Sequence, residues 1–222
     1  VYLSRWMPET GFLREEGSPI ANAKRLLVAG VAVVRRTPAL RVLVIAILVA
    51  GLAEEAVDRL DVLRLVEAGL DANAAVVVGF IAAFEALMGA TALWRIEHRV
   101  AGQGAVTVFS TIYIVSAAFV LLLAVAPAWA VGGLAIVVQG GIRQAAVPAV
   151  TVWANAHSEE STRATVHSFV GQFEALGEIG GGIALGAVAA LTSVRTALLC
   201  SAGLMVVAAA TAWRGRSAWG DT

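Results

Sequence analysis

The sequence is poor in cysteine and in charged residues, and each shortage excludes a class of protein. Among its 222 residues there is one cysteine, Cys200, so the chain cannot form an internal disulfide or a cysteine-based metal site. Charged residues make up 14% of the chain and hydrophobic residues 59%, whereas a soluble domain has about 25% charged residues. We therefore expect a helical membrane protein rather than a soluble one.

Signatures of other functions are missing as well. The 16 basic and 16 acidic residues balance to a net charge of zero, which argues against a nucleic-acid-binding surface. The sequence has no Walker loop and no G-x-S-x-G, and its three histidines lack metal-ligand spacing. We expect no enzymatic activity, no metal and no cofactor.

The most informative stretch runs from Pro38 to Arg64. Twelve apolar residues, Val42 to Ala53, are followed at once by a charged cluster of Glu54, Glu55, Asp58, Arg59 and Asp61. Twelve helical residues cover about 18 Å, whereas the hydrocarbon core of a bilayer is about 30 Å thick. Either the segment stops short of spanning the membrane, or it carries acidic side chains into it.

Six segments are near or above the roughly 20 residues that a membrane span needs. They cover residues 39–63, 73–95, 104–126, 128–153, 163–190 and 193–213. The fold class we expect is all-α, a polytopic six-helix membrane bundle over residues 38–213. Before it, residues 1–18 read as the end of a preceding helix and a cytoplasmic loop, and residues 19–37 as an amphipathic interfacial helix. Residues 214–222 would form a cytoplasmic tail.

The distribution of basic residues supports six alternating spans. With both ends of the chain on the cytoplasmic side, that side holds twelve basic residues, and the other side holds Arg64 and Arg195. This asymmetry is typical of inner or plasma membrane proteins, and it disappears if residues 39–63 do not span. Trp94, Trp129 and Trp153 fall at predicted span ends, as does Trp213, where an aromatic belt is expected.

Polar side chains at membrane depth are the strongest functional signal, because each costs about 2.5–3.5 kcal/mol to insert. The candidates for a substrate or proton pathway are Glu54, Glu85, Gln139, Arg143, Glu174 and Glu178. A single arginine in lipid requires a carboxylate partner, and we expect Glu174 or Glu178 for Arg143, because their spans are neighbours in sequence. A purely structural polar bridge remains the alternative.

Glycines indicate close helix packing along the fifth predicted span. The pairs Gly177/Gly181 and Gly182/Gly186 each have the G-x-x-x-G spacing that lets helices approach closely. In the fourth span, Gly140, Gly141 and Pro148 predict either a helix irregularity or ordinary close packing.

Three stretches give the chain a family resemblance. Met7 to Phe12 (MPETGF) is followed by Thr37-Pro38 and GLAEEAVDRL, and later by RATV and GQFEALGEIGGGIALG. With these stretches the chain resembles the C-terminal half of a major facilitator superfamily transporter of the bacterial efflux-permease type. The loop TALWRIEHRVAGQG keeps Arg95 and Arg99 of a family motif but lacks its glycine-aspartate core.

The resemblance implies half of a twelve-helix secondary active transporter that exports a small organic solute or drug, coupled to protons, by alternating access. The expected partners are the solute, protons, the lipid bilayer and an N-terminal six-helix half of the same protein. Two alternatives stay open: a non-transporting scaffold or receptor-like protein of the same fold, and a membrane subunit of an ATP-driven transporter.

Overall fold

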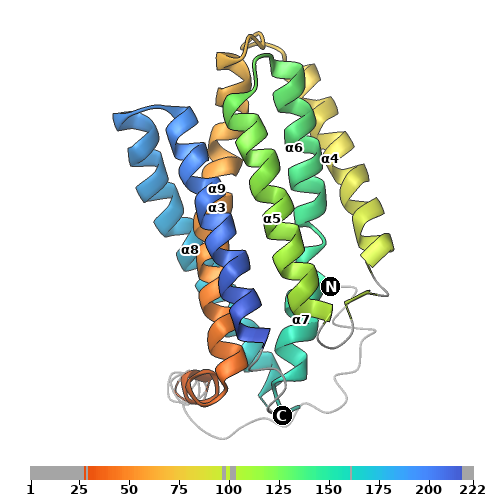
Figure 1. Cartoon of the computed structure of the whole chain (residues 1–222), viewed down its shortest axis with the longest axis vertical. Helices are drawn as coiled ribbons and strands as arrows, with labels where there is room; N and C mark the ends of the chain where they lie inside the picture. Colours follow the sequence, from red (N-terminus) through yellow and green to blue (C-terminus); the bar gives the residue numbers. More distant parts are fainter. Residues whose placement is uncertain (1–27, 29, 97–98, 101–103, 161, 217–222) are drawn as a thin grey trace, which may run out of the picture.

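A computed structural model describes residues 28, 30–96, 99–100, 104–160 and 162–216, and all its regular elements are helices (Figure 1). The helices are α3 (Pro38–Glu67), α4 (Ala75–Ile96), α5 (Gly104–Val125), α6 (Trp129–Arg143), α7 (Ala146–Ala156), α8 (Arg163–Leu191) and α9 (Val194–Arg214). Their bounds follow the six predicted segments closely, except that the fourth segment forms two helices.

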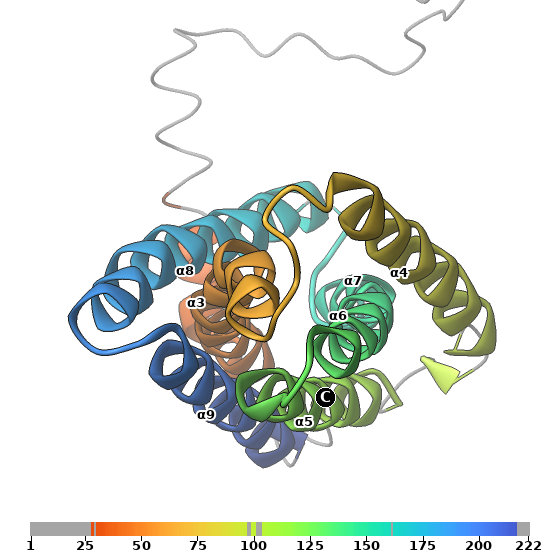
Figure 2. The same ribbon diagram turned by 90° about the horizontal axis from the view of Figure 1, so that it is seen from above.

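The helices run up and down the long axis of the molecule and form one bundle (Figure 1). Helix α3 lies near the centre and packs chiefly against α8 and α9, with contacts to α5, α6 and α7 (Figure 2). Helices α5 and α9 pack together on one side, and α4 packs against α6. The core between them consists mainly of alanine, valine and leucine, with few polar side chains.

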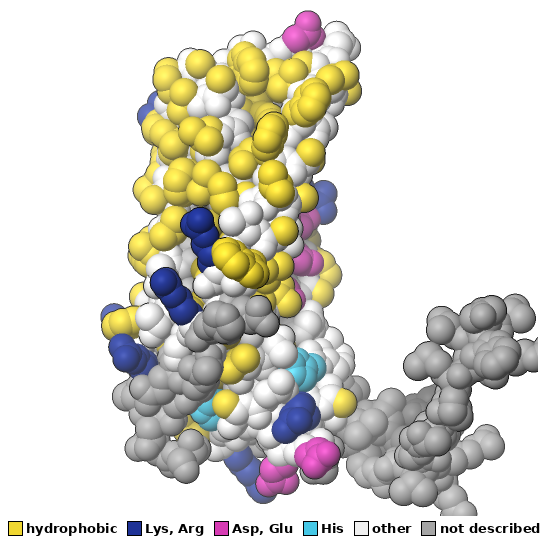
Figure 3. Space-filling model, turned by 90° about the vertical axis from the view of Figure 1, so that its right-hand side faces the viewer, with side chains coloured by type: hydrophobic (Ala, Val, Ile, Leu, Met, Phe, Trp, Pro, Cys, Tyr) yellow, Lys and Arg dark blue, Asp and Glu magenta, His cyan; other side chains and the backbone are white. Residues whose placement is uncertain are grey.

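Five helical stretches are long and apolar enough to cross a membrane: α4, α5, α6 with α7, α8 and α9. Hydrophobic side chains cover much of the face shown in Figure 3. The chain therefore has the build of a polytopic helical membrane protein. Helix α3 is not among the five, although its 30 residues are about 45 Å long, because its second half carries the charged cluster that begins at Glu54.

The fourth predicted segment is broken between α6 and α7, at Gln144 and Ala145. Pro148 explains the position of the break. A proline has no N–H to donate to the carbonyl four residues earlier, and its ring clashes with that carbonyl, which here belongs to Gln144. The irregularity that the sequence left open thus lies one turn before the proline.

Gly140 and Gly141 are inside α6 and mark a close helix contact instead. A Cβ atom at Gly140 would meet the side chain of Glu85 on α4, and one at Gly141 would meet Met88. Gly89 on α4 faces the side chain of Gln144 in return. Small residues on both helices let α4 and α6 approach closely.

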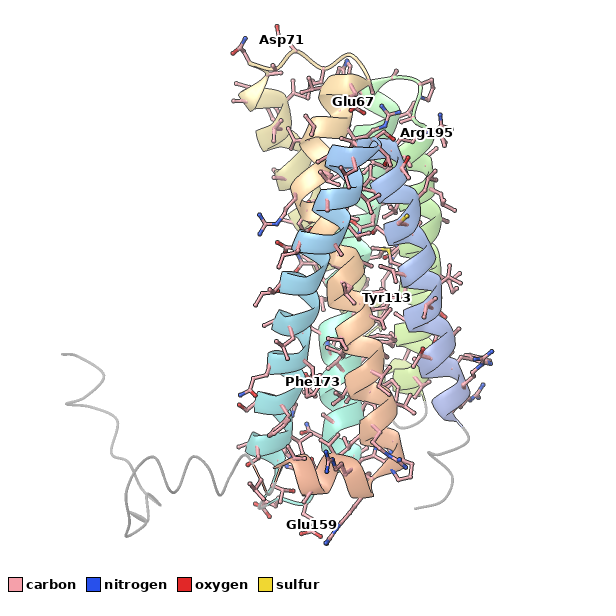
Figure 4. All side chains as sticks on the ribbon, turned by 90° about the vertical axis from the view of Figure 1, so that its left-hand side faces the viewer. Glu67, Asp71, Tyr113, Glu159, Phe173 and Arg195 are labelled. Carbon is pink, nitrogen blue, oxygen red and sulfur yellow. The ribbon has the colours of Figure 1, made fainter. Side chains whose placement is uncertain are left out.

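Charged residues lie at both ends of the bundle, and most of the arginines lie at one of them. Glu67, Asp71 and Arg195 lie at one end and Glu159 at the other, with Tyr113 between them (Figure 4). Most of the described arginines lie at the Glu159 end: Arg35, Arg36, Arg41, Arg95, Arg99, Arg163, Arg214 and Arg216.

The structure tests the expected aromatic belt and part of the expected interfacial helix. Trp153 is not a belt residue, because it is fully buried and packs edge-on against Phe109, with ring centroids 6.1 Å apart; Trp94, Trp129 and Trp213 are exposed. Of the expected interfacial helix, residues 30–36 are helical. Residues 19–27 and the segments 1–18 and 217–222 lie outside the described part of the chain.

Candidate functional site

A cavity of about 460 Å³ opens between α3, α5, α6, α7 and α8. Its described lining combines apolar side chains with four carboxylates and one guanidinium: Glu54, Asp58, Glu174, Glu178 and Arg143. The charged side chains come from three helices, α3, α6 and α8. A polar cavity inside an otherwise apolar bundle is the feature that most distinguishes this molecule from a passive membrane anchor.

Arg143 is the centre of the charged group. Its Nη1 atom lies 3.1 Å from Oδ2 of Asp58 and 3.4 Å from Oε2 of Glu54. Arg143 is the last residue of α6, so the helix ends where the ion pairs form and just before the break at Gln144. The guanidinium thus connects α6 to two successive turns of α3.

This arrangement corrects the expected partner of Arg143. The sequence suggested Glu174 or Glu178, because α8 follows α6 and α7 in the chain, but the described ion pairs of Arg143 are with Glu54 and Asp58. The physical reason is packing: α6 contacts the central helix α3. Glu54 and Asp58, four residues apart, lie on the same face of α3.

Glu54 is the most enclosed of these carboxylates, with a residue exposure of 7%. The hydroxyl of Tyr113 on α5 donates a hydrogen bond to its Oε1 atom at 2.7 Å. Tyr113 is itself buried and held by Phe109, whose ring centroid is 4.5 Å away. Glu54 therefore accepts a hydrogen bond from α5 and forms an ion pair with α6. The helices α3, α5 and α6 meet at its carboxylate.

Glu174 and Glu178 line the cavity from α8, one turn apart, and both are exposed. His167 lies on the same helix and contacts Oδ1 of Asn155 on α7 at 2.9 Å through Nε2. The α8 side of the cavity is thus open, whereas on α3 Glu54 is enclosed and Asp58 is exposed.

Two predicted site residues lie elsewhere. Glu85 is half-buried on α4 and packs against Gly140, outside the cavity lining. Gln139 is buried in α6 with an exposure of 4%, and its Nε2 has no hydrogen-bond partner among the described residues. The structure therefore brings Glu54, Arg143, Glu174 and Glu178 to one cavity and leaves Glu85 and Gln139 aside.

The two predicted glycine pairs differ in what they pack against. Gly177 and Gly181 are buried against α3, where a Cβ atom would meet the backbone of Leu48 or Leu52. Gly182 lies beside the Glu55–Arg59 ion pair, and Gly186 has open space around it. Gly51 on α3 in turn faces the backbone carbonyl of Glu174.

Sequence reasoning left two contributors out of the site, Asp58 and Tyr113. Asp58 lies one helical turn after Glu54, but it also lies near the end of the predicted span 39–63, where a carboxylate can reach the headgroup region. Tyr113 is one of the aromatic residues in the predicted spans that could line a cavity, but aromatic residues at helical spacing more often pack in a core.

Comparisons with protein-family models, with curated proteins and with solved structures found no match to this chain. The fold defines the chain as a polytopic helical membrane protein.

Proposed function

We propose that the chain is the C-terminal half of a major facilitator superfamily transporter, with α3 as the first of six spans and both ends on the cytoplasmic side. In this proposal the complete protein exports a small organic solute in exchange for protons by alternating access. The observation that carries it is the ion-paired cavity, in which Arg143 connects the end of α6 to Glu54 and Asp58 of α3.

The composition of the cavity supports a transported or exchanged cation. Four carboxylates against one guanidinium leave the described lining with an excess of negative charge. Such an excess favours protons or a cationic solute over an anion. Ionisable groups at membrane depth are also the usual components of proton relays in transporters.

The helix break supplies a place for movement. When Glu54 takes up a proton, Arg143 loses one of its two carboxylate partners and keeps Asp58. Because Arg143 immediately precedes the break between α6 and α7, this change acts where backbone hydrogen bonding is already interrupted. In the proposed cycle, α7 then moves relative to α3, and the cavity closes on one side and opens on the other.

In the proposal, an N-terminal half completes the cavity. Helices α4 and α8 carry large exposed hydrophobic side chains, among them Phe80, Phe84, Leu176 and Ile179. Lipid or a second group of helices covers such surfaces in a membrane protein. In the proposal, a six-helix N-terminal half covers the α8 side of the cavity, where Glu174 and Glu178 are exposed.

The test is a flux assay on the complete protein in liposomes, with ethidium and Hoechst 33342 as transported probes and enclosed pyranine as the proton reporter. We expect probe movement that requires a pH gradient and is accompanied by opposite proton movement. Glu54→Gln should abolish the exchange, and the matched control Glu67→Gln, at the end of α3, should retain it. Absence of gradient-driven movement of both probes, or equal activity of the two variants, would contradict the proposal.

A further inference from the structure

Helices α5 and α9 pack side by side (Figure 2). Two neighbouring grooves lie beside α5, apart from the cavity described above: one between α5 and α9, and one between α5, Ile96 at the end of α4, and Arg99 and Arg216. The first, of about 380 Å³, is mainly apolar, with Ile114 and Val206 about half-exposed in its wall. The second, of about 400 Å³, is lined partly by arginine and threonine. Thr111 lines both grooves, so they are adjacent.

Basic side chains gather at one end of this pair of grooves. Arg214 lines the apolar groove, and Arg99 and Arg216 line the other. The guanidinium of Arg216 lies 5.0 Å from the ring centroid of Trp213, which fixes it beside the groove. The described residues of both linings include no acidic side chain.

The beginning of α5 lies at the same end. Gly104, its first residue, lines the second groove and sits directly against the backbone carbonyl of Arg99. The first N–H groups of a helix have no intrahelical acceptor and carry a partial positive charge. They add to the attraction of three arginines for a negatively charged group.

The dimensions distinguish a lipid from a free anion. The apolar groove follows α9 from Val206 to Arg214, nine residues, a length of about 14 Å. One leaflet contributes about half of a 30 Å hydrocarbon core. The apolar part of the groove therefore has the length of an acyl chain that begins at the basic end and reaches toward the bilayer centre.

We propose that this groove binds an anionic phospholipid. Its phosphate lies among Arg99, Arg214 and Arg216, and one acyl chain lies along the α5–α9 seam. Trp213 stands at the boundary, where aromatic rings favour the headgroup level. The arginine-rich end of the bundle corresponds to the leaflet in which anionic lipids attract basic residues next to the membrane. The inference is independent of transport, because it needs only that the bundle is embedded in a bilayer.

The test is native mass spectrometry of the detergent-purified full-length protein with dioleoyl phosphatidylglycerol, dioleoyl phosphatidylcholine or inorganic phosphate. We expect retained phosphatidylglycerol in clear preference to phosphatidylcholine. Arg214→Gln and Arg216→Gln should each weaken its binding about five-fold, since one basic residue near an anionic surface contributes about that factor. Arg195→Gln, at the opposite end of the bundle, is the matched control and should change nothing.

A second variant tests the position of the acyl chain. Ala210→Trp fills the apolar groove without altering a charge, so it should reduce phosphatidylglycerol binding and leave the weak binding of inorganic phosphate unchanged. Equal retention of both lipids would overturn the proposal, as would equal effects of Arg195→Gln and Arg214→Gln. Insensitivity to Ala210→Trp would overturn the acyl-chain position, and tighter binding of phosphate than of lipid would indicate a site for a free anion.

Discussion

Arg143 at the end of α6 and Asp58 on α3 form an ion pair, with Nη1 3.1 Å from Oδ2, at the mouth of a cavity in an apolar bundle. Glu54, one turn earlier on α3, is the second partner of Arg143, with its Oε2 atom 3.4 Å from the same Nη1 atom. The pair joins the central helix to a broken helix.

The Arg143–Glu54 pair should appear as an energetic coupling. In a cycle of Arg143→Gln, Glu54→Gln and the double variant, we expect a coupling of about 1–3 kcal/mol in the free energy of unfolding, as for residues in one ion-pair network. Denaturation of the purified protein by dodecyl sulfate measures it. The same cycle with Glu178→Gln is the control and should give less than about 0.5 kcal/mol. A larger coupling to Glu178 than to Glu54 would restore the partner suggested by the sequence.

The hydroxyl of Tyr113 should stabilise the charged form of Glu54. Tyr113→Phe removes one donor and keeps the ring that packs on Phe109. We expect it to lower the free energy of unfolding by about 1.5–3 kcal/mol, the usual contribution of a hydrogen bond to a charged group. In a Glu54→Gln background the loss should be clearly smaller. The same loss in both backgrounds would show that the hydroxyl acts elsewhere.

The close contact of α3 and α8 should tolerate no added methyl group at its glycines. Gly177→Ala and Gly181→Ala place a Cβ against the backbone of α3, and overpacking of this kind costs about 1–3 kcal/mol. Gly186→Ala, on the same helix but in open space, should instead raise the thermal unfolding midpoint, because alanine favours a helix over glycine by about 1 kcal/mol. Equal midpoints for Gly181→Ala and Gly186→Ala would contradict the packing described.

The break between α6 and α7 should depend on Pro148. Pro148→Ala restores a donor for the carbonyl of Gln144, so amide hydrogen exchange at residues 145–148 should slow. Pro38→Ala is the matched control, because Pro38 occupies the first turn of α3, where its missing N–H has no intrahelical acceptor to lose. Unchanged exchange at residues 145–148 would assign the break to tertiary packing.

The sequence predicts the helices well because their limits depend on local chemistry. Apolar length sets each span, Pro38 marks the beginning of α3, and Ser193 precedes α9, where its side chain accepts a hydrogen bond from the Thr196 N–H at 3.1 Å. For Pro148 the sequence leaves an irregularity and close packing open, and the structure has the break one turn before the proline. These features need no knowledge of which helices are neighbours.

The site is harder to predict because it depends on those neighbours. Arg143 pairs across to α3 rather than to the α8 glutamates, and Trp153 points into the core although it lies near a helix end. Likewise, Gly177 and Gly186 belong to one glycine-rich run, but α3 contacts the first and not the second. Periodicity places such residues on helix faces, and three-dimensional packing decides what each face meets.

Two-sided accessibility of the cavity in the complete protein tests alternating access. Gly171 lines the cavity on α8 with nothing within 4 Å of a Cβ position, so Gly171→Cys in a Cys200→Ser background introduces a reporter without a clash. Gly186→Cys, on α8 outside the cavity lining, is the control. A membrane-impermeant methanethiosulfonate is then applied to right-side-out and to inside-out vesicles at two pH values.

Alternating access predicts that Gly171→Cys reacts from both sides, and that a change of pH accelerates labelling from one side while slowing it from the other. Glu54→Gln should remove this opposite response, and Gly186→Cys should never show it. Labelling of Gly171→Cys from a single side under every condition would contradict alternating access.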